Sequence, residues 1–139
     1  MLNQYMNNDI LLYKTLINHI PLALLVEDEN RNITLTNQPF CDLFEIKLTP
    51  EQMTGYDSAQ AAEEVKYLMD NPDSFLKRIE SLLLTRQPVQ NELVEMKNGT
   101  KLLRDYIPVF NDEFHLGHVW LYKDITHIHR IQENKGLDD

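Results

Sequence analysis

The chain has 139 residues, 42% of them hydrophobic, which suits one domain with a single core. Thirteen basic and twenty-two acidic residues leave a formal charge of -9, and such a surface repels nucleic acids and anionic lipid headgroups. The sequence contains no apolar run near the roughly 18 residues that span a bilayer, and its start lacks a signal-peptide pattern. We therefore expect a cytoplasmic protein that neither binds nucleic acid directly nor inserts into a membrane.

The first predicted helix carries five apolar residues along one seam, at spacings of four, three, four and three. They are Met6, Ile10, Tyr13, Ile17 and Ile20. Pro21 ends this helix. The seam could pack on the chain's own domain or on a second copy, and about three heptads do not decide between these two arrangements. We expect residues 1–20 to form a flanking or dimerisation helix.

Two short apolar or β-branched segments follow, residues 22–26 and 33–36, with a polar turn between them. They predict a first hairpin. Asn37 and Pro39 then open a short helix that carries Phe40 and Phe44. The run Thr49-Pro50-Glu51-Gln52 has the capping-box pattern and predicts a second small helix.

Two further helices are predicted before the chain changes to strand character. Asp57 and Ser58 are candidate caps for a helix that runs to Met69. After Asn71-Pro72, apolar residues recur at i, i+4, i+7 and i+8, which indicates one buried helical stripe. These residues are Phe75, Ile79, Leu82 and Leu83.

The remaining segments all predict strands. Residues 89–97 and 100–110 flank Asn98-Gly99, the dipeptide that favours a type I′ hairpin turn. Residues 114–123 form a third strand that is apolar on both faces, which predicts a central place in a sheet. The order of two strands, several helices and three strands predicts an α+β domain, an antiparallel sheet with its helices on one face.

The alternation within residues 114–123 also predicts which side chains share a face. Leu116, Trp120 and Tyr122 should point to one side, and Val119 and Leu121 to the other. Such a strand has an outer face that needs a cover, and the N-terminal helix of the same chain or of a partner is the available one.

This third strand ends at Asp124-Ile125-Thr126, where Asp124 or Thr126 can cap an exit helix. The helix itself is suggested by Ile125, Ile128 and Ile131. Asp124 could also pair with a nearby cation such as Arg104 or Lys123.

Three motifs resemble those of Per-Arnt-Sim (PAS) sensor domains: Asn37-x-x-Phe40, Asn98-Gly99 and the closing segment 117–126. Their order extends the resemblance over about residues 18–126. This part of the chain is similar to PAS units of bacterial sensor histidine kinases. The resemblance implies a five-stranded antiparallel sheet that cups a small cavity together with its helices. It also implies a domain at 21–126, a signalling helix or linker that starts at 127–139, frequent dimerisation, and an effector domain outside this chain.

The same resemblance raises haem and flavin as cofactors, and the residues argue against both. Haem-binding PAS domains often supply an axial histidine from the long helix before the three strands, but residues 73–86 contain none. Light-sensing flavin relatives carry a cysteine in an Asn-Cys-Arg-Phe-type motif on a middle helix, whereas Cys41 directly follows Phe40 on the first small helix. We therefore expect neither cofactor, and we expect Cys41 to be a small buried hydrophobic residue.

Metal binding and catalysis are also disfavoured. His127 and His129 lie about 200° apart around a predicted helix, and His115 and His118 should face opposite sides of their strand. The single cysteine excludes an internal disulfide. No Gly-x-Ser-x-Gly motif occurs and no glycine-rich nucleotide box is present, so we expect neither an enzyme nor a kinase core.

A small-molecule pocket could lie between the helices and the sheet. Its candidate lining consists of Phe40, Phe44, Leu68, Phe75, Ile79, Leu83, Tyr106, Trp120 and Tyr122. The alternative is a filled core, in which buried hydroxyl and indole groups bond backbone carbonyls. We thus expect a sensory module that binds a small ligand or partner and relays the change through Asp124 and Thr126. The alternative function is a ligand-free dimerisation scaffold.

Overall fold

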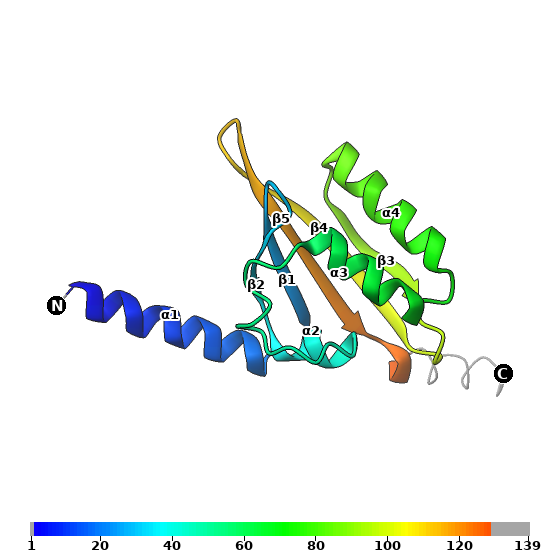
Figure 1. Cartoon of the computed structure of the whole chain (residues 1–139), viewed down its shortest axis with the longest axis horizontal. Helices are drawn as coiled ribbons and strands as arrows, with labels where there is room; N and C mark the ends of the chain where they lie inside the picture. Colours follow the sequence, from blue (N-terminus) through cyan, green and yellow to red (C-terminus); the bar gives the residue numbers. More distant parts are fainter. Residues whose placement is uncertain (1, 129–139) are drawn as a thin grey trace.

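The computed structural model describes residues 2–128, which form a five-stranded antiparallel sheet with helices on one face and one helix projecting from its end (Figure 1). The strand order is β2-β1-β5-β4-β3. The expected α+β architecture with an N-terminal flanking helix is confirmed. The elements are α1 (Leu2–His19), β1 (Ala23–Asp28), β2 (Ile33–Thr36), α2 (Gln38–Leu43), α3 (Ser58–Val65), the 3-10 helix η1 (Lys66–Leu68), α4 (Pro72–Thr85), β3 (Val89–Glu95), β4 (Lys101–Asn111) and β5 (Phe114–Asp124).

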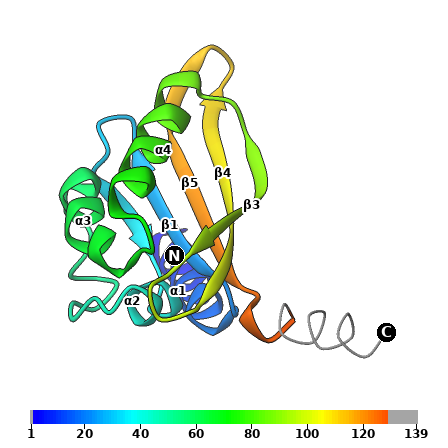
Figure 2. The ribbon, with the colours of Figure 1, turned by 90° about the vertical axis from the view of Figure 1, so that its right-hand side faces the viewer.

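Strand β5 lies in the middle of the sheet, as its two apolar faces predict. It pairs with β1 on one side and with β4 on the other. Helices α3 and α4 lie on one face of the sheet (Figure 2). Trp120 and Tyr122 are buried on this face, while Val119 and Leu121 are half-buried on the outer face. The apolar side chains of β5 therefore contribute to the core on one face of the sheet and to the outer surface on the other.

A β-bulge changes the alternation near the start of β5. Val109 pairs with Gly117, but Phe110 pairs with His115, so Leu116 is an extra residue on β5. The insertion places His115 and His118 on the same face, with 4.6 Å between their ring centroids. The prediction of opposite faces for these two histidines was wrong, and Leu116 is exposed instead of lying beside Trp120.

The hairpin at Asn98-Gly99 is confirmed, but its predicted turn type is wrong. Gly99 has a φ of +92°, whereas Asn98 does not adopt a positive φ, which a type I′ turn requires. The Gly99 N–H donates to the Met96 carbonyl at 3.0 Å, and the Thr100 N–H donates to the Asn98 side chain at 3.0 Å. The Asn98 side chain thus stabilises a longer loop that needs a left-handed conformation only at the glycine.

The capping box at Thr49 forms without the helix that it predicts. The Thr49 N–H donates to Gln52 Oε1 at 2.9 Å, and the Gln52 N–H donates to Thr49 Oγ1 at 3.2 Å. Residues 50–55 nevertheless form only turns. Gly55, at a φ of +87°, returns the chain to β2, where its N–H donates to the Ile33 carbonyl at 2.7 Å.

The helix predicted to reach Met69 also ends early. α3 stops at Val65, and η1 continues only to Leu68. Met69 is extended because it pairs with Met96 in an isolated β-bridge. A contact with a segment 27 residues later in the chain therefore overrides the local helical signal.

Asn37 connects helix α1 to the sheet. Its buried side-chain amide donates to the Ile17 carbonyl at 2.6 Å and to the Leu22 carbonyl at 2.8 Å. Its side-chain oxygen accepts from the N–H groups of Leu24 and Phe40, which also caps α2. One side chain thus fixes the end of α1, the start of β1 and the start of α2.

Most of helix α1 projects away from the sheet (Figure 1). It does not cover the outer face of its own sheet, where Leu93 and Ile107 remain exposed. No helix within residues 2–128 has the length and apolar character needed to cross a membrane.

Candidate functional site

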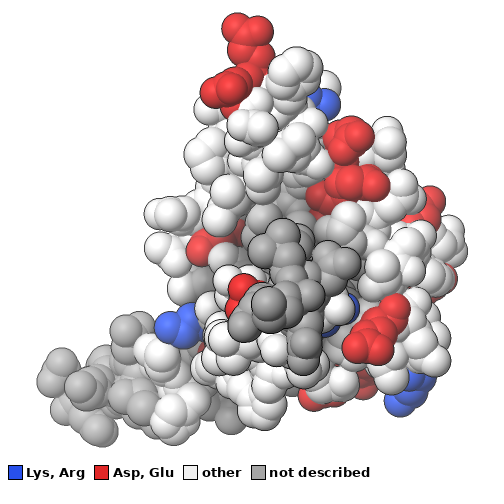
Figure 3. Space-filling model, turned by 90° about the vertical axis from the view of Figure 1, so that its left-hand side faces the viewer, with Lys and Arg blue, Asp and Glu red and all other residues white. Residues whose placement is uncertain are grey.

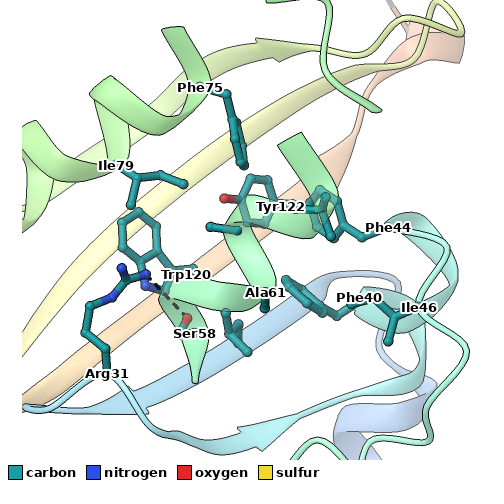
Figure 4. Close-up of a pocket in the computed structure, with 13 residues that line it drawn as sticks. Arg31, Phe40, Phe44, Ile46, Ser58, Ala61, Phe75, Ile79, Trp120 and Tyr122 are labelled. Atoms are coloured by element: carbon teal, nitrogen blue, oxygen red, sulfur yellow. Dashed lines mark hydrogen bonds between the residues drawn. The ribbon is translucent and has the colours of Figure 1, made fainter. Parts of the chain in front are cut away.

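An apolar cavity lies between the sheet and helices α2, α3 and α4 (Figure 4). Phe40 and Phe44 stand at one end with Tyr122, whose ring is edge-on to Phe44 at 5.0 Å. Phe75 and Ile79 of α4 close it from the side opposite the sheet. Six of the nine predicted lining residues are therefore brought together here: Phe40, Phe44, Phe75, Ile79, Trp120 and Tyr122.

The other three predicted residues lie elsewhere in the core. Leu68 and Leu83 are half-buried and pack against the core cluster, and Tyr106 is fully buried beside His118. Sequence reasoning missed part of the lining: one residue from β1, two from loops and four from α3. The missed residues are Leu25, Arg31, Ile46, Ser58, Ala61, Ala62 and Val65.

Arg31 and Ser58 form the polar end of this cavity. Arg31 Nε donates to Glu27 Oε1 at 3.0 Å, and its Nη2 donates to Ser58 Oγ at 3.4 Å (Figure 4). The Glu27 side chain is fully buried, and its Oε2 has no hydrogen-bond partner within residues 2–128. The Trp120 indole N–H is likewise buried and without a partner there. These groups would suit a ligand with an apolar body and one polar end.

The cavity is small, about 40 Å³. Since one water needs roughly 10 to 15 Å³ of such space, it has room for only a few water molecules. Typical small-molecule pockets measure about 300 to 1,000 Å³. A larger ligand would have to displace α3 or α4.

Next to this cavity, the buried Tyr106 and His118 and the half-buried His115 form a polar group on the same face of the sheet. The Tyr106 hydroxyl and His118 Nδ1 share a hydrogen bond of 2.7 Å. Burial lowers the pKa of His118 to about 4, against the raising effect of the Glu27 carboxylate. Burial also raises the pKa of Tyr106 to about 12. Both rings are therefore uncharged near neutral pH.

A second hollow, which we call the α4–β3 cleft, has a volume of about 310 Å³. Its wall includes Phe75 and Arg78 from α4, Glu92 from β3 and Arg104 from β4. Glu92 accepts from Arg78 Nε at 2.5 Å and from Arg104 Nη2 at 3.1 Å. Burial acts to raise the pKa of Glu92, but the two arginines outweigh it and hold this pKa below its usual value. The carboxylate therefore stays charged.

The junction after β5 carries the predicted relay residues. Asp124 Oδ1 accepts from the Thr126 N–H at 2.9 Å and from the Thr126 hydroxyl at 2.5 Å. Thr126 Oγ1 in turn accepts from the Lys101 N–H, and the Ile125 N–H donates to the Lys101 carbonyl, both at 2.9 Å. Residues 126–128 are helical, and Ile131 lies outside the described residues. The junction is thus bound to the start of β4.

Arg104 does not serve Asp124 as the cation that the sequence suggests, because it pairs with Glu92. Of the predicted seam on α1, Ile10, Tyr13 and Ile20 are exposed, and Ile17 is half-buried near β2. The Met6 side chain lies outside the described part of the structure.

The sequence predicts that Cys41 is a small buried hydrophobic residue and disfavours a metal site. Cys41 is fully buried and free, and burial raises the pKa of its thiol. Within residues 2–128, no group of three or more His, Cys, Asp or Glu side chains is placed to hold a metal ion. His129 lies outside these residues. Asp and Glu side chains are spread over the face shown in Figure 3, in keeping with the net charge of -9.

Solved structures of signalling proteins share this fold. The PAS domain of BvgS from Bordetella pertussis has a TM-score of 0.61 and 19% identity, over 94% of this chain and 97% of that chain. A sensory box sensor histidine kinase from Vibrio cholerae has a TM-score of 0.55 and 18% identity, over 89% of this chain and 98% of that chain. The sensor region of another sensor histidine kinase has a TM-score of 0.59 and 16% identity over 77% of this chain, which spans 40% of that region's length.

No curated protein sequence matches the chain significantly. A family model described as PAS domain matches residues 11–88, which is more than half of the chain. This match covers α1 from Leu11 through α4, and the fold likeness extends the comparison over β5. The chain therefore belongs to the PAS domain family.

Proposed function

We propose that this chain is the sensory module of a signalling protein and passes the binding of a small molecule or partner to an effector domain. One observation carries the proposal: β5 touches both the cavity and the exit. Trp120 and Tyr122 in its second half line the core cavity, and its last residue, Asp124, holds the helical segment that begins at Thr126. A shift of β5 caused at the cavity would therefore reach the junction within a few residues.

The junction is suited to two arrangements because its hydrogen bonds are few and partly exposed. Asp124 accepts both of the hydrogen bonds that Thr126 donates, and two hydrogen bonds with Lys101 connect Ile125 and Thr126 to β4. A capping interaction of this kind contributes on the order of 1 kcal/mol. A modest movement of β5 against β4 would thus suffice to change the population of the junction.

The relay can be tested with Asp124→Ala in a protein that contains the effector domain. The substitution removes the acceptor of both Thr126 bonds, so we expect a changed output and faster hydrogen exchange at the Thr126 amide. Glu113→Ala, which removes an exposed carboxylate at the opposite end of β5, is the control. Unchanged output and unchanged stimulus response in Asp124→Ala would contradict the relay.

A second candidate function is a ligand-free dimerisation and coupling scaffold. The size of the core cavity favours it, since about 40 Å³ admits only a few waters. Native mass spectrometry of freshly purified protein distinguishes the two functions. A retained small molecule supports ligand sensing, and consistent emptiness across expression conditions supports the scaffold.

PAS domains are sensory modules that are generally not catalytic, and we propose the same for this chain. We also propose that it forms a homodimer through the exposed apolar seam of α1. The expectations of a cytoplasmic location and of neither haem nor flavin stay predictions. An absorbance scan of the purified protein tests the cofactor prediction, because either group would give a visible band.

A further inference from the structure

Arg104 is a buried guanidinium whose hydrogen-bonding groups are only partly used. Its side chain is 3% exposed, and its Nη2 donates to Glu92. Its Nε and Nη1 have no hydrogen-bond partner within residues 2–128. A buried charge with unused donors is costly, so such a group calls for a further acceptor. The Tyr122 hydroxyl lies beside the guanidinium. Burial raises the pKa of Tyr122, and Arg104 acts to lower it through its charge and a hydrogen bond to the hydroxyl.

Arg104 lies at the wall of the α4–β3 cleft, which has the volume of a small-molecule site. Phe75 borders both this cleft and the core cavity, and its ring centre is 6.0 Å from the Arg104 guanidinium carbon. The flat apolar ring and the planar cation therefore form one corner of the cleft. Arg78, less buried than Arg104, stands on the other side of Glu92.

Arg78, Arg104 and Glu92 meet at this corner, and these three side chains together have a net charge of +1. Arg78 and Arg104 share a single carboxylate, that of Glu92. Two more acidic residues, Asp70 and Glu95, line the cleft and are exposed, and Glu95 is paired with Lys101 at 2.7 Å. Arg78, Arg104 and Glu92 thus form a cationic group within a cleft whose full lining, with Asp70 and Glu95, has a net charge of -1.

We propose that the α4–β3 cleft binds a small carboxylate, which is held between the guanidinium groups of Arg104 and Arg78. A carboxylate is planar and accepts two parallel N–H bonds, which matches the donor geometry of arginine. It would supply the acceptor that Arg104 lacks, and its organic part would lie against the Phe75 ring. This site goes beyond the proposed function, because it exists whether or not the core cavity takes a ligand.

The site can be tested by titrating the ¹⁵N-labelled chain with succinate and benzoate and recording NMR spectra. The matched neutral probes are succinamide and benzamide, and inorganic phosphate is the non-planar anion. We expect saturable shifts of the Arg104 Nε–H signal and of backbone amides in β3 with at least one carboxylate, and weaker or no shifts with the amides and phosphate.

Two variants accompany the titration, so that a loss of folding in one of them does not leave the site untested. Arg104→Gln should weaken carboxylate binding by about tenfold or more, since it removes the charge and most donors. Because this change also leaves Glu92 short of a partner, Ser74→Phe serves as the second variant. Ser74 is exposed on α4 and lines the cleft, so a phenyl ring there fills the site and leaves the Arg104–Glu92 pair intact. Lys77→Gln removes an exposed charge from the same helix without touching the cleft, and it should bind normally.

Three outcomes would overturn the proposal. The first is the absence of any saturable carboxylate shift, which would mean that water molecules satisfy Arg104. The second is equal binding of the carboxylates and their amides or of phosphate. The third is full retention of binding in a folded Ser74→Phe protein. None of these outcomes depends on signal output, so a failure here leaves the relay at Asp124 to be judged separately.

Discussion

His118 places an ionisable ring inside the core, between β4 and β1. Its pKa of about 4 lies below the ordinary value of about 6.5, because burial disfavours the charged ring. Between these two pH values the unfolded chain binds a proton that the folded chain does not. We therefore expect the free energy of unfolding to fall as the pH decreases from about 6.5 to about 4, and this contribution to level off below that.

Chemical denaturation at several pH values measures this effect. His118→Gln keeps a polar group opposite Tyr106 but cannot gain a proton, so its stability should depend less on pH across this window. His19→Gln, a change at an exposed histidine of α1, should retain the full dependence. Glu27 and His115 face the same ring and act on its pKa in opposite directions, so the comparison is between variants and not with an absolute slope. Parallel curves for His118→Gln and the parent chain would refute the assignment.

At this scale the sequence predicts the aromatic part of the cavity but not its polar end. Phe75 and Ile79 recur at helical spacing, and Trp120 and Tyr122 alternate along a strand, so a periodic sequence pattern identifies them as core residues. Arg31 instead belongs to a turn and has a φ of +65°, and Ser58 reads as a helix cap. No periodicity connects residues in a turn with a cavity, and only the fold brings them there.

Gly117 controls how closely two strands approach. An added Cβ would lie 2.0 Å from the Glu27 carbonyl oxygen and 3.1 Å from Asp28 Cα. Both are backbone atoms of β1, so rotation of a side chain cannot relieve the contact. Gly117→Ala must push β1 away from β5 or distort the bulge, and we expect it to lower the free energy of unfolding by about 1 to 3 kcal/mol.

Thermal or urea unfolding of the isolated chain measures this loss. Leu116→Ala, at the exposed neighbouring position, should change stability by no more than about 0.5 kcal/mol. If Gly117→Ala were as stable as the parent chain, the close approach of β1 and β5 at this point would be wrong.

Elements follow from the sequence where their signals are local. Asn98-Gly99 marks a hairpin, and the stripe from Phe75 marks α4, because each depends on neighbouring residues. The bulge at Leu116 cannot be seen in this way, since an inserted residue looks like any other until its pairing partners are known. The same limit explains why α3 stops before Met69, whose β-bridge to Met96 is a long-range contact.

The whole molecule presents an apolar surface on α1 that its own sheet does not cover. Ile10, Tyr13 and Ile20 of the predicted seam are 48%, 61% and 42% exposed. We expect a homodimer in which this surface is buried, since large exposed apolar patches mark association sites. Light scattering over a range of concentrations should report a mass of twice one chain.

A matched pair of variants tests the location of the interface. Ile10→Asp introduces a charge on the seam and should give a monomer, whereas Asn8→Asp adds the same charge at another exposed position of α1 and should remain a dimer. A parent chain that stays monomeric at high concentration, with α1 intact by circular dichroism, would exclude this dimer.

The Asn37 side chain has a consequence for how the two ends of the chain communicate. It fastens the last turn of α1 to the start of β1, and Ala23 of β1 lies opposite Tyr122 near the end of β5. The end of α1 and the end of β5 are therefore connected through two neighbouring strands, β1 and β5. A rotation of α1 would reach the end of β5 through the backbone hydrogen bonds between β1 and β5. A domain with this connection could pass a movement of α1 to the segment after β5 without a ligand in its core cavity.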